Sequence, residues 1–185
     1  EAVHALAPSG GAHHGMANQA QGFGIYNETA VAIQVLLDAG MERVAYIDVD
    51  VHHGNGTQWI FYDDPSVLYV SLHQSPYYPG TGAVDEVGRG AGRGFTVNVP
   101  LAAGATDADY ALVGDTIVDP VLRAFAPELV VVSAGFDAHE RDPLGGMRVT
   151  TAGYAASMAL LWQVATETCA GRLLAVTEGG YDLTA

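Results

Sequence analysis

Four short, mostly apolar runs constrain the fold of this chain more than any other sequence feature. They span residues 44–49, 67–72, 129–133 and 173–177. Because each run is apolar at successive rather than alternate positions, it predicts a strand buried on both faces of a sheet. Helical patterns separate the runs, at residues 28–39, 107–125 and 151–169. This alternation predicts an α/β layered fold around a mostly parallel sheet. The glycine- and proline-rich stretch 74–94 is expected to be a loop.

The composition fits one globular domain. The chain has 185 residues, of which 49% are hydrophobic and 15% are charged, so it can bury a core of its own. No apolar stretch approaches the roughly 20 residues of a membrane span, so we expect no membrane association. The single cysteine, Cys169, excludes an intramolecular disulfide and a zinc site built from paired thiolates. These features favour a cytoplasmic protein. Because the sequence begins with Glu1 and ends just after a motif, we interpret residues 1–185 as a single partial domain.

The charge balance narrows the possible partners. The sequence carries 21 acidic residues and seven basic ones, for a net charge of −14. Such a surface repels phosphates, which argues against nucleic-acid binding. Two interpretations stay open: attraction of cationic partners such as basic protein tails, or a solubilising surface with no specific partner.

Polar residues gather where the predicted strands end. Asp48, Asp50 and His52 follow one another at intervals of two, so on a strand they would project to one face. Burying three polar groups costs too much free energy unless something binds them. Carboxylates and an imidazole suit zinc or another first-row divalent ion. Asp137, after the run 129–133, would complete a two-Asp, one-His set with open coordination positions, as in catalytic zinc sites. On its own, Asp137 is equally compatible with a helix cap or a turn.

Two other motifs offer groups for hydrolysis. His13 and His14 lie in a glycine-rich loop and could take a proton from an activated water, although loop histidines can also be merely solvated. Tyr181 ends a Glu-Gly-Gly-Tyr sequence after the fourth run. Its phenol could donate to a developing oxyanion, or it could simply pack in a turn.

Together these motifs resemble, in order, those of zinc-dependent histone deacetylases. The similarity is greatest to bacterial acetoin-utilisation deacetylases and acetylpolyamine amidohydrolases, and it spans about residues 10–181. It implies a three-layer α-β-α fold with a mostly parallel central sheet, truncated at both ends. The resemblance rests on nine segments: Gly11-Ala-His-His14, Gly22-Phe23, Asp48-Val-Asp-Val-His-His-Gly-Asn-Gly56, Ser71-Leu-His73, Pro79-Gly-Thr-Gly82, Asn98-Val-Pro-Leu101, Ser133-Ala-Gly-Phe-Asp137, Asp142-Pro-Leu144 and Glu178-Gly-Gly-Tyr181.

The resemblance implies a role for each metal-binding and proton-transferring residue. Asp50, His52 and Asp137 match the zinc ligands, and the same set accepts iron. His14 matches the general base and acid, whereas His13 matches a mainly electrostatic partner.

Further roles follow from the same resemblance. Asp48 matches the carboxylate that orients His13. Asn55 stands where many relatives place an aspartate beside His14, and Tyr181 matches the tyrosine that polarises the amide carbonyl. Four residues match the wall and rim of an acyl-lysine tunnel: Gly22, Phe23, Tyr78 and Leu144. Backbone oxygens of five would bind a structural potassium ion: Asp48, Asp50, His52, Ser71 and Leu72.

The resemblance implies an enzyme that removes acetyl groups from acetyl-lysine in proteins, or from small acetylated amines. One alternative is a dinuclear manganese ureohydrolase of the arginase or agmatinase type. That centre needs extra carboxylates, whereas residues 54–56 are Gly-Asn-Gly and His139 replaces the second aspartate. The other alternative is a non-catalytic protein of the same fold that only binds acyl ligands.

Overall fold

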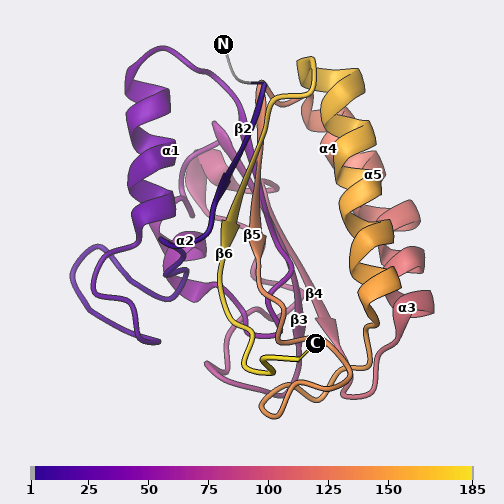
Figure 1. Cartoon of the computed structure of the whole chain (residues 1–185). Coiled ribbons are helices and arrows are strands. Elements are labelled where there is room, and N and C mark those ends of the chain that lie inside the picture. Colours follow the sequence, from indigo (N-terminus) through magenta and orange to yellow (C-terminus); the bar gives the residue numbers. More distant parts are fainter. Residues whose placement is uncertain (1–2, 185) are drawn as a thin grey trace.

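A six-stranded sheet forms the centre of the molecule (Figure 1), in a computed structural model that describes residues 3–184. All neighbouring strands are parallel, in the order β1-β6-β5-β2-β3-β4. This sheet confirms the α/β fold predicted from the apolar runs. Its strands are β1 (His4–Ala7), β2 (Val44–Asp48), β3 (Val67–Gln74), β4 (Thr96–Leu101), β5 (Leu129–Ala134) and β6 (Leu173–Thr177).

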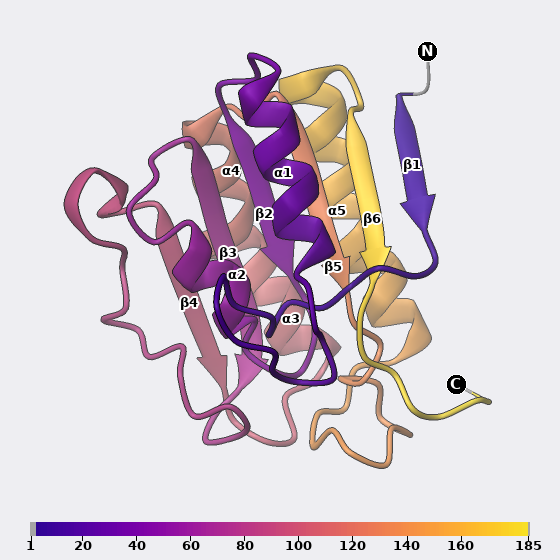
Figure 2. The same ribbon diagram turned by 90° about the vertical axis from the view of Figure 1, so that its left-hand side faces the viewer.

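Helices cover both faces of the sheet and make the molecule three layers thick. Two of them, α1 (Glu28–Asp38) and α2 (Asn55–Ile60), lie on one face (Figure 2). The opposite face carries α3 (Asp107–Val113), α4 (Asp119–Phe125) and α5 (Thr151–Cys169). No helix in the described part of the chain is long and apolar enough to cross a membrane.

The central strands are apolar at successive positions because they are buried from both sides. In β5, Val130 and Val132 join the core cluster under α3 to α5, whereas Val131 joins the cluster under α1. In β2, Ile47 belongs to the cluster under α3 to α5, and Tyr46 belongs to the cluster under α1. Side chains of a strand alternate between faces, so each face of the sheet needs its own apolar set.

Some elements differ from the prediction. The helix expected over 107–125 is α3 and α4 joined by a π-helical segment, Gly114–Val118. β3 extends through Gln74 into the expected loop, which also contains a 3₁₀ turn at Gly90–Gly92. Two edge strands, β1 and β4, and the short helix α2 were not predicted. An edge strand contacts a neighbour on only one side, and β1 is largely exposed, so its sequence lacks the two-sided apolar signal.

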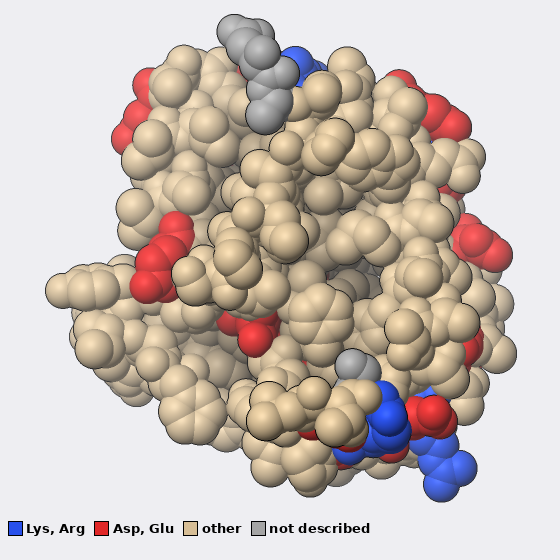
Figure 3. Space-filling view, in the orientation of Figure 1, with Lys and Arg blue, Asp and Glu red and all other residues tan. Residues whose placement is uncertain are grey.

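Acidic side chains are scattered, rather than gathered in one patch, on one face of the molecule (Figure 3). On the face shown in Figure 3, acidic side chains appear at several separate places, and most basic atoms lie near the C-terminal end. This face therefore carries no continuous acidic surface for a cationic partner.

Candidate active site and metal centre

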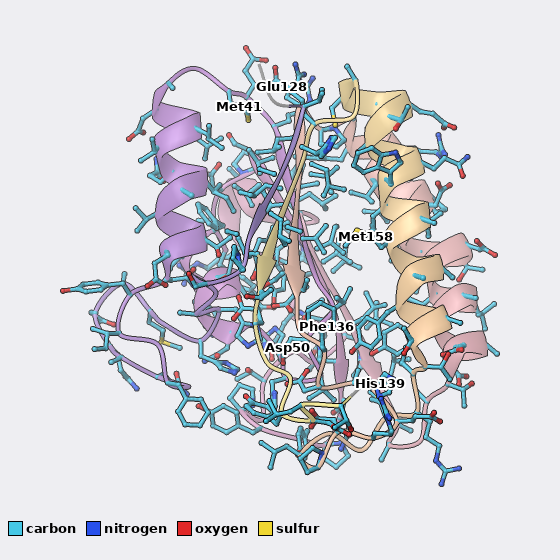
Figure 4. All side chains as sticks on the ribbon, viewed as in Figure 1. Met41, Asp50, Glu128, Phe136, His139 and Met158 are labelled. Atoms are coloured by element: carbon cyan, nitrogen blue, oxygen red, sulfur yellow. The ribbon has the colours of Figure 1, made fainter. Side chains whose placement is uncertain are left out.

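The candidate residues meet at the carboxyl ends of the strands, where parallel α/β sheets usually bind ligands. Asp48 ends β2, Asp137 follows β5 and Tyr181 follows β6. In Figure 4, Asp50 and Phe136 lie at this end of the sheet. The loop that carries His13 is attached to α2, where the Thr57 amide donates to the His13 carbonyl at 3.0 Å. Residues from four separate segments thus reach one place.

Asp50, His52 and Asp137 form a cluster with the geometry of a metal site. One potential ligand atom from each residue lies within 4.8 Å of the others. The Nδ1 atom of His52 is 3.0 Å from an oxygen of Asp50 and 3.0 Å from an oxygen of Asp137. Both carboxylates are fully buried, and two buried anions that point at one position require a positive charge there. Two carboxylates and one imidazole therefore fit a divalent cation, and zinc is among those that take this ligand set.

Backbone groups fix the orientation of the two carboxylates. The second oxygen of Asp50 accepts from the Gly179 amide at 2.8 Å, and the second oxygen of Asp137 accepts from the Val51 amide at 2.8 Å. Gly179 has no room for a side chain, because a Cβ atom there would lie 2.2 Å from Asp137 Oδ2. Each aspartate thus directs one oxygen at the cluster while a backbone amide holds the other, an arrangement that orients metal ligands. The cluster-facing oxygen of Asp50 also accepts from the His52 amide.

The expectation that Asp48, Asp50 and His52 lie on one strand is wrong. β2 ends at Asp48, and the next four residues are irregular. The reason is local hydrogen bonding: Asp48 accepts from the Asp50 amide at 3.1 Å, and Asp50 accepts from the His52 amide at 2.8 Å. Aspartate side chains that bind the backbone two residues ahead replace the ladder of the sheet with turns. The closely spaced aspartates are the sequence signal for these turns.

A chain of hydrogen bonds joins the two histidines to their supports. His13 Nδ1 lies 2.8 Å from Asp48, the two Nε2 atoms lie 3.0 Å apart, and His14 Nδ1 lies 2.8 Å from the side-chain oxygen of Asn55. Asn55 in turn donates to Gln21 at 3.1 Å. An amide oxygen only accepts, so His14 Nδ1 carries a hydrogen, and its neutral Nε2 accepts from His13. With Nδ1–H also donated to Asp48, His13 carries both protons.

Electrostatics agree with this assignment of protons. Burial and, after it, the positive charge of His13 lower the pKa of His14 to about 4. Burial alone would also lower the pKa of His13, but the negative charges of Asp48 and Asp50 raise it well above the usual value of 6.5. At neutral pH the pair therefore consists of a charged His13 and a neutral His14, and the neutral ring is the one that can accept a proton.

A cavity of about 580 Å³ opens over the metal cluster and the two histidines. Its wall contains all four residues expected to contact substrate, but Phe23 is 99% exposed and lies at the mouth. Tyr78 packs edge-on against the His14 ring with centroids 5.1 Å apart. The floor is polar and the mouth is aromatic. Its lining residues are Gly11, Ala12, His13, His14, Gly22, Phe23, Gly24, Asp50, His52, Tyr78, Leu144, Glu178, Gly179, Gly180 and Tyr181.

Two residues of the site were missed by the sequence analysis. Glu178 accepts from the Ser133 hydroxyl at 2.6 Å and from the His13 amide at 3.4 Å, and burial raises its pKa to about 7. Tyr77 stacks on the His52 ring with centroids 5.2 Å apart, and its hydroxyl donates to the Leu144 carbonyl. Glu178 belongs to a motif in which only the tyrosine was considered. Nothing in the sequence distinguishes Tyr77 from its neighbour Tyr78.

Three of the five backbone positions expected for potassium lie on the neighbouring strands β2 and β3, whereas Asp50 and His52 lie in the irregular segment after β2. Asp48 pairs with Ser71 in the β2–β3 register, and Leu72 follows in β3. His139 lies outside the metal cluster, where it stacks on Tyr154 and hydrogen-bonds Thr151 at 3.3 Å.

Comparisons with known proteins agree on the family. A model of the histone deacetylase domain matches residues 1–185. The chain is 46% identical over 171 residues to a probable deacetylase of Archaeoglobus fulgidus. This match covers 92% of this chain and 48% of that protein. It is 40% identical over 185 residues to the acetoin utilization protein AcuC of Bacillus subtilis, covering 99% of this chain and 48% of the relative.

A solved structure has the same fold. The crystal structure of the HDA15 HD domain superposes with a TM-score of 0.88 at 46% sequence identity, and the match covers 94% of this chain and 49% of that one. The chain thus spans about half the length of these relatives. The match of the domain model over the whole chain, at these levels of identity, shows that the chain belongs to the histone deacetylase family.

Proposed function

We propose that the full-length protein is a metal-dependent deacetylase that hydrolyses the acetyl amide of acetyl-lysine in proteins, or of small acetylated amines, and releases acetate. Residues 1–185 form part of its single catalytic domain. One observation carries the proposal: the metal cluster and a neutral histidine held by a charged one line the same cavity. The deacetylase names of the relatives support the same class of reaction. The lone cysteine fits a cytoplasmic location.

The metal we propose is zinc, with iron as the other candidate, held by Asp50, His52 and Asp137. When bound, such an ion supplies Lewis-acid chemistry: it polarises an amide carbonyl and makes water more acidic. A structural potassium ion is proposed at the backbone oxygens of Asp48, Asp50, His52, Ser71 and Leu72, where the ends of β2 and β3 lie side by side.

His14 and His13 divide the proton transfers between them. His14 is neutral at pH 7, and Asn55 holds its ring through Nδ1. Its Nε2 takes a proton from the attacking water once that water replaces the His13 N–H as its hydrogen-bond donor. After the water oxygen has bonded to the carbonyl carbon, His14 returns that proton to the amine nitrogen as the C–N bond breaks. His13 stays protonated against Asp48, and its positive charge stabilises the negative charge that develops on the substrate.

Tyr181 supplies a hydrogen-bond donor to the carbonyl oxygen. Burial raises the pKa of its phenol to about 12, so the phenol keeps its proton at neutral pH. A donor aimed at the oxygen contributes most when that oxygen becomes negative, so its effect belongs to the transition state.

The wall of the cavity suits an extended acyl-amine chain. Tyr78 and Leu144 offer apolar surface, and Phe23 extends that surface at the mouth. We assign to the Gly22 carbonyl a hydrogen bond from the substrate amide N–H. A slender alkyl chain with a polar amide at its end matches an apolar wall above a polar floor.

The direct test is turnover by the full-length protein with and without a chelator. We expect acetate release from an acetyl-lysine peptide or an acetylated polyamine, loss of activity on chelation, and recovery with zinc or iron. Comparing the two substrates decides between protein and small-amine specificity. Absence of turnover on both substrates by metal-loaded protein would favour the non-catalytic acyl binder. About two metal ions per chain with guanidinium hydrolysis would favour the manganese ureohydrolase.

The ligand assignment predicts the behaviour of two variants. His52→Ala or Asp137→Ala removes one of three ligands and leaves a buried carboxylate without its counter-charge, so bound metal and activity should disappear together. The measurement is metal content per folded chain. His139→Ala is the control, because this histidine also follows a strand but lies outside the cluster, and it should keep its metal. Full metal occupancy in His52→Ala would show that the ligands are wrongly assigned.

The tyrosine assignment predicts a selective loss of turnover. Loss of a comparable oxyanion donor costs roughly 100- to 1,000-fold in kcat, and Tyr181→Phe should lose about as much while it keeps the metal and its affinity for substrate. Steady-state kinetics separates kcat from KM. Tyr62→Phe is the control: Tyr62 packs against Trp59 and is not among the described residues that line the cavity, so removal of its hydroxyl should be neutral. If Tyr181→Phe costs less than about threefold, well under the range for such a donor, the tyrosine has no catalytic role.

A further inference from the structure

One buried carboxylate outside the predicted site receives three backbone hydrogen bonds. Asp142 is 8% exposed. Its Oδ1 atom accepts from the amides of Leu144 at 2.9 Å and Gly145 at 3.1 Å, and its Oδ2 atom accepts from the amide of Tyr181 at 2.7 Å. Ionised aspartate can accept all three bonds because it has two acceptor oxygens and no donor.

These bonds connect two parts of the same cavity wall. Leu144 and Tyr181 both line the cavity, although they lie on different loops. The loop around Leu144 also packs closely against the backbone of Asp137, one of the three proposed metal ligands. The evidence is at Gly145, where an added Cβ atom would lie 1.8 Å from the Asp137 carbonyl oxygen. Through Asp142, the backbone of Tyr181 is therefore tied to a segment that has little freedom to move.

Tyr181 needs such an attachment because the residues before it do not fix its direction. Gly179 and Gly180 precede it, and Gly180 has φ +144°, a conformation that residues with side chains rarely adopt. The amide of Gly179 donates to Asp50 at 2.8 Å and its carbonyl accepts from the Phe136 amide at 2.6 Å, but Gly180 separates these contacts from Tyr181. The hydrogen bond from the Tyr181 amide to Asp142 is the next fixed point along the chain.

We propose that Asp142 is the positioning residue for Tyr181: it holds the tyrosine backbone so that the phenol points at the reacting carbonyl. This inference rests on the proposed deacetylase function. A misplacement of about 1 Å in a catalytic group can reduce turnover about 100-fold, so loss of the contact affects kcat more than substrate binding.

The test is Asp142→Asn in the full-length protein, measured with the substrate that the protein turns over. Asparagine offers one acceptor oxygen, and its amide group must face a backbone N–H that it cannot satisfy. We expect full metal content and a kcat at least tenfold lower, by the same sensitivity to misplacement. Asp142→Glu keeps the charge but moves it by one methylene, and it should also lower kcat.

A double variant separates positioning from general stabilisation of the loop. If Asp142 acts through the Tyr181 phenol, Asp142→Asn should add little in a Tyr181→Phe background, where the phenol is already lost. A purely structural role would lower activity by the same factor in both backgrounds. Asp107→Asn is the matched control, because Asp107 also accepts on both oxygens, from the Thr150 amide and hydroxyl. That variant should lose stability and keep kcat.

The outcomes distinguish the two claims. If Tyr181→Phe itself leaves kcat unchanged, the catalytic role of Tyr181 is refuted, and the positioning role of Asp142 is refuted with it. The positioning role is refuted if Tyr181→Phe lowers kcat whereas folded Asp142→Asn and Asp142→Glu keep the kcat of the unmodified protein. It is also refuted if, in the double variant, the losses of kcat from Asp142→Asn and Tyr181→Phe multiply.

Discussion

At the scale of single residues, the two adjacent histidines owe their different charge states to different partners. His13 faces the carboxylate of Asp48, whereas His14 faces the uncharged amide of Asn55. An aspartate beside an imidazole raises its pKa by adding a negative charge, whereas the uncharged Asn55 amide raises the pKa of His14 only through its hydrogen bond. Burial and the charge of His13 outweigh that bond, so His14 stays neutral, which is the form that accepts a proton.

This difference predicts the effect of Asn55→Asp on pH dependence. A new carboxylate raises the pKa of His14, so a larger fraction of the base is protonated at any given pH. Because only the neutral ring accepts a proton, the acid limb of the pH–kcat/KM profile should move to higher pH. Asn18→Asp adds the same charge at an exposed position and should leave the profile in place. An unchanged profile in Asn55→Asp would mean that Asn55 does not control the base.

The sequence identifies the residues that carry the chemistry, but not the hydrogen-bond partners that position their side chains and backbone. Asp50, His52 and Asp137 carry recognisable metal-binding chemistry, and the structure brings them together. Gln21 and Asp142 act only as hydrogen-bond partners, and their contacts lie 34 and 39 positions away along the chain. Such pairings depend on how loops pack in the folded protein, and no local pattern encodes them.

At the scale of secondary structure, burial determines what could be predicted. The four central strands are apolar toward both layers, so their sequences stand out, and α5 begins and ends at the predicted residues. The edge strand β4 is only partly buried along its length and contains Asn98 and Pro100, which weakens the signal. The π-helical segment Gly114–Val118 was not predicted, because five residues with i→i+5 hydrogen bonds are too few to change the periodicity of the surrounding helical pattern.

The end of α5 offers a test of helix capping. Ala170 adopts a left-handed conformation with φ +55°, which costs an alanine about 1–2 kcal/mol and a glycine almost nothing. Ala170→Gly should therefore raise the free energy of unfolding by about 0.5–1 kcal/mol, less than the full strain because glycine also gains entropy when unfolded. Ala159→Gly, in the interior of the same helix, should lower it by about 1 kcal/mol. Chemical denaturation measures both, and a loss of stability in Ala170→Gly would contradict the assignment of strain.

At the scale of the whole molecule, the metal cluster and the histidine pair depend on different parts of the sheet. The ligands lie after β2 and β5, which are direct neighbours in the centre. The histidines follow β1, a four-residue strand at the edge that pairs only with β6. Edge strands with little buried surface open at lower free energy than central strands.

Hydrogen exchange tests this difference. The backbone amides of residues 4–7 should exchange faster than those of β2 and β5, because β1 is paired on one side and mostly exposed whereas the central strands are buried. Mass spectrometry of the chain of residues 1–185, in which β1 is the edge strand, measures the rates segment by segment. Equal protection of β1 and β2 would show that the sheet opens as one unit.

The two halves of the site are joined to the sheet in different ways. The His13 amide donates to Glu178, 165 positions away along the chain. His52 and Asp137 are 85 positions apart and follow β2 and β5, which pair directly. Within residues 1–185, we therefore expect the two halves of the site to open at different rates. When β1 detaches from β6, the proton-transfer half opens while the metal-binding half stays assembled. Under mild heating, we expect a species that retains its metal yet has lost its activity, and cooling restores that activity without any new metal uptake.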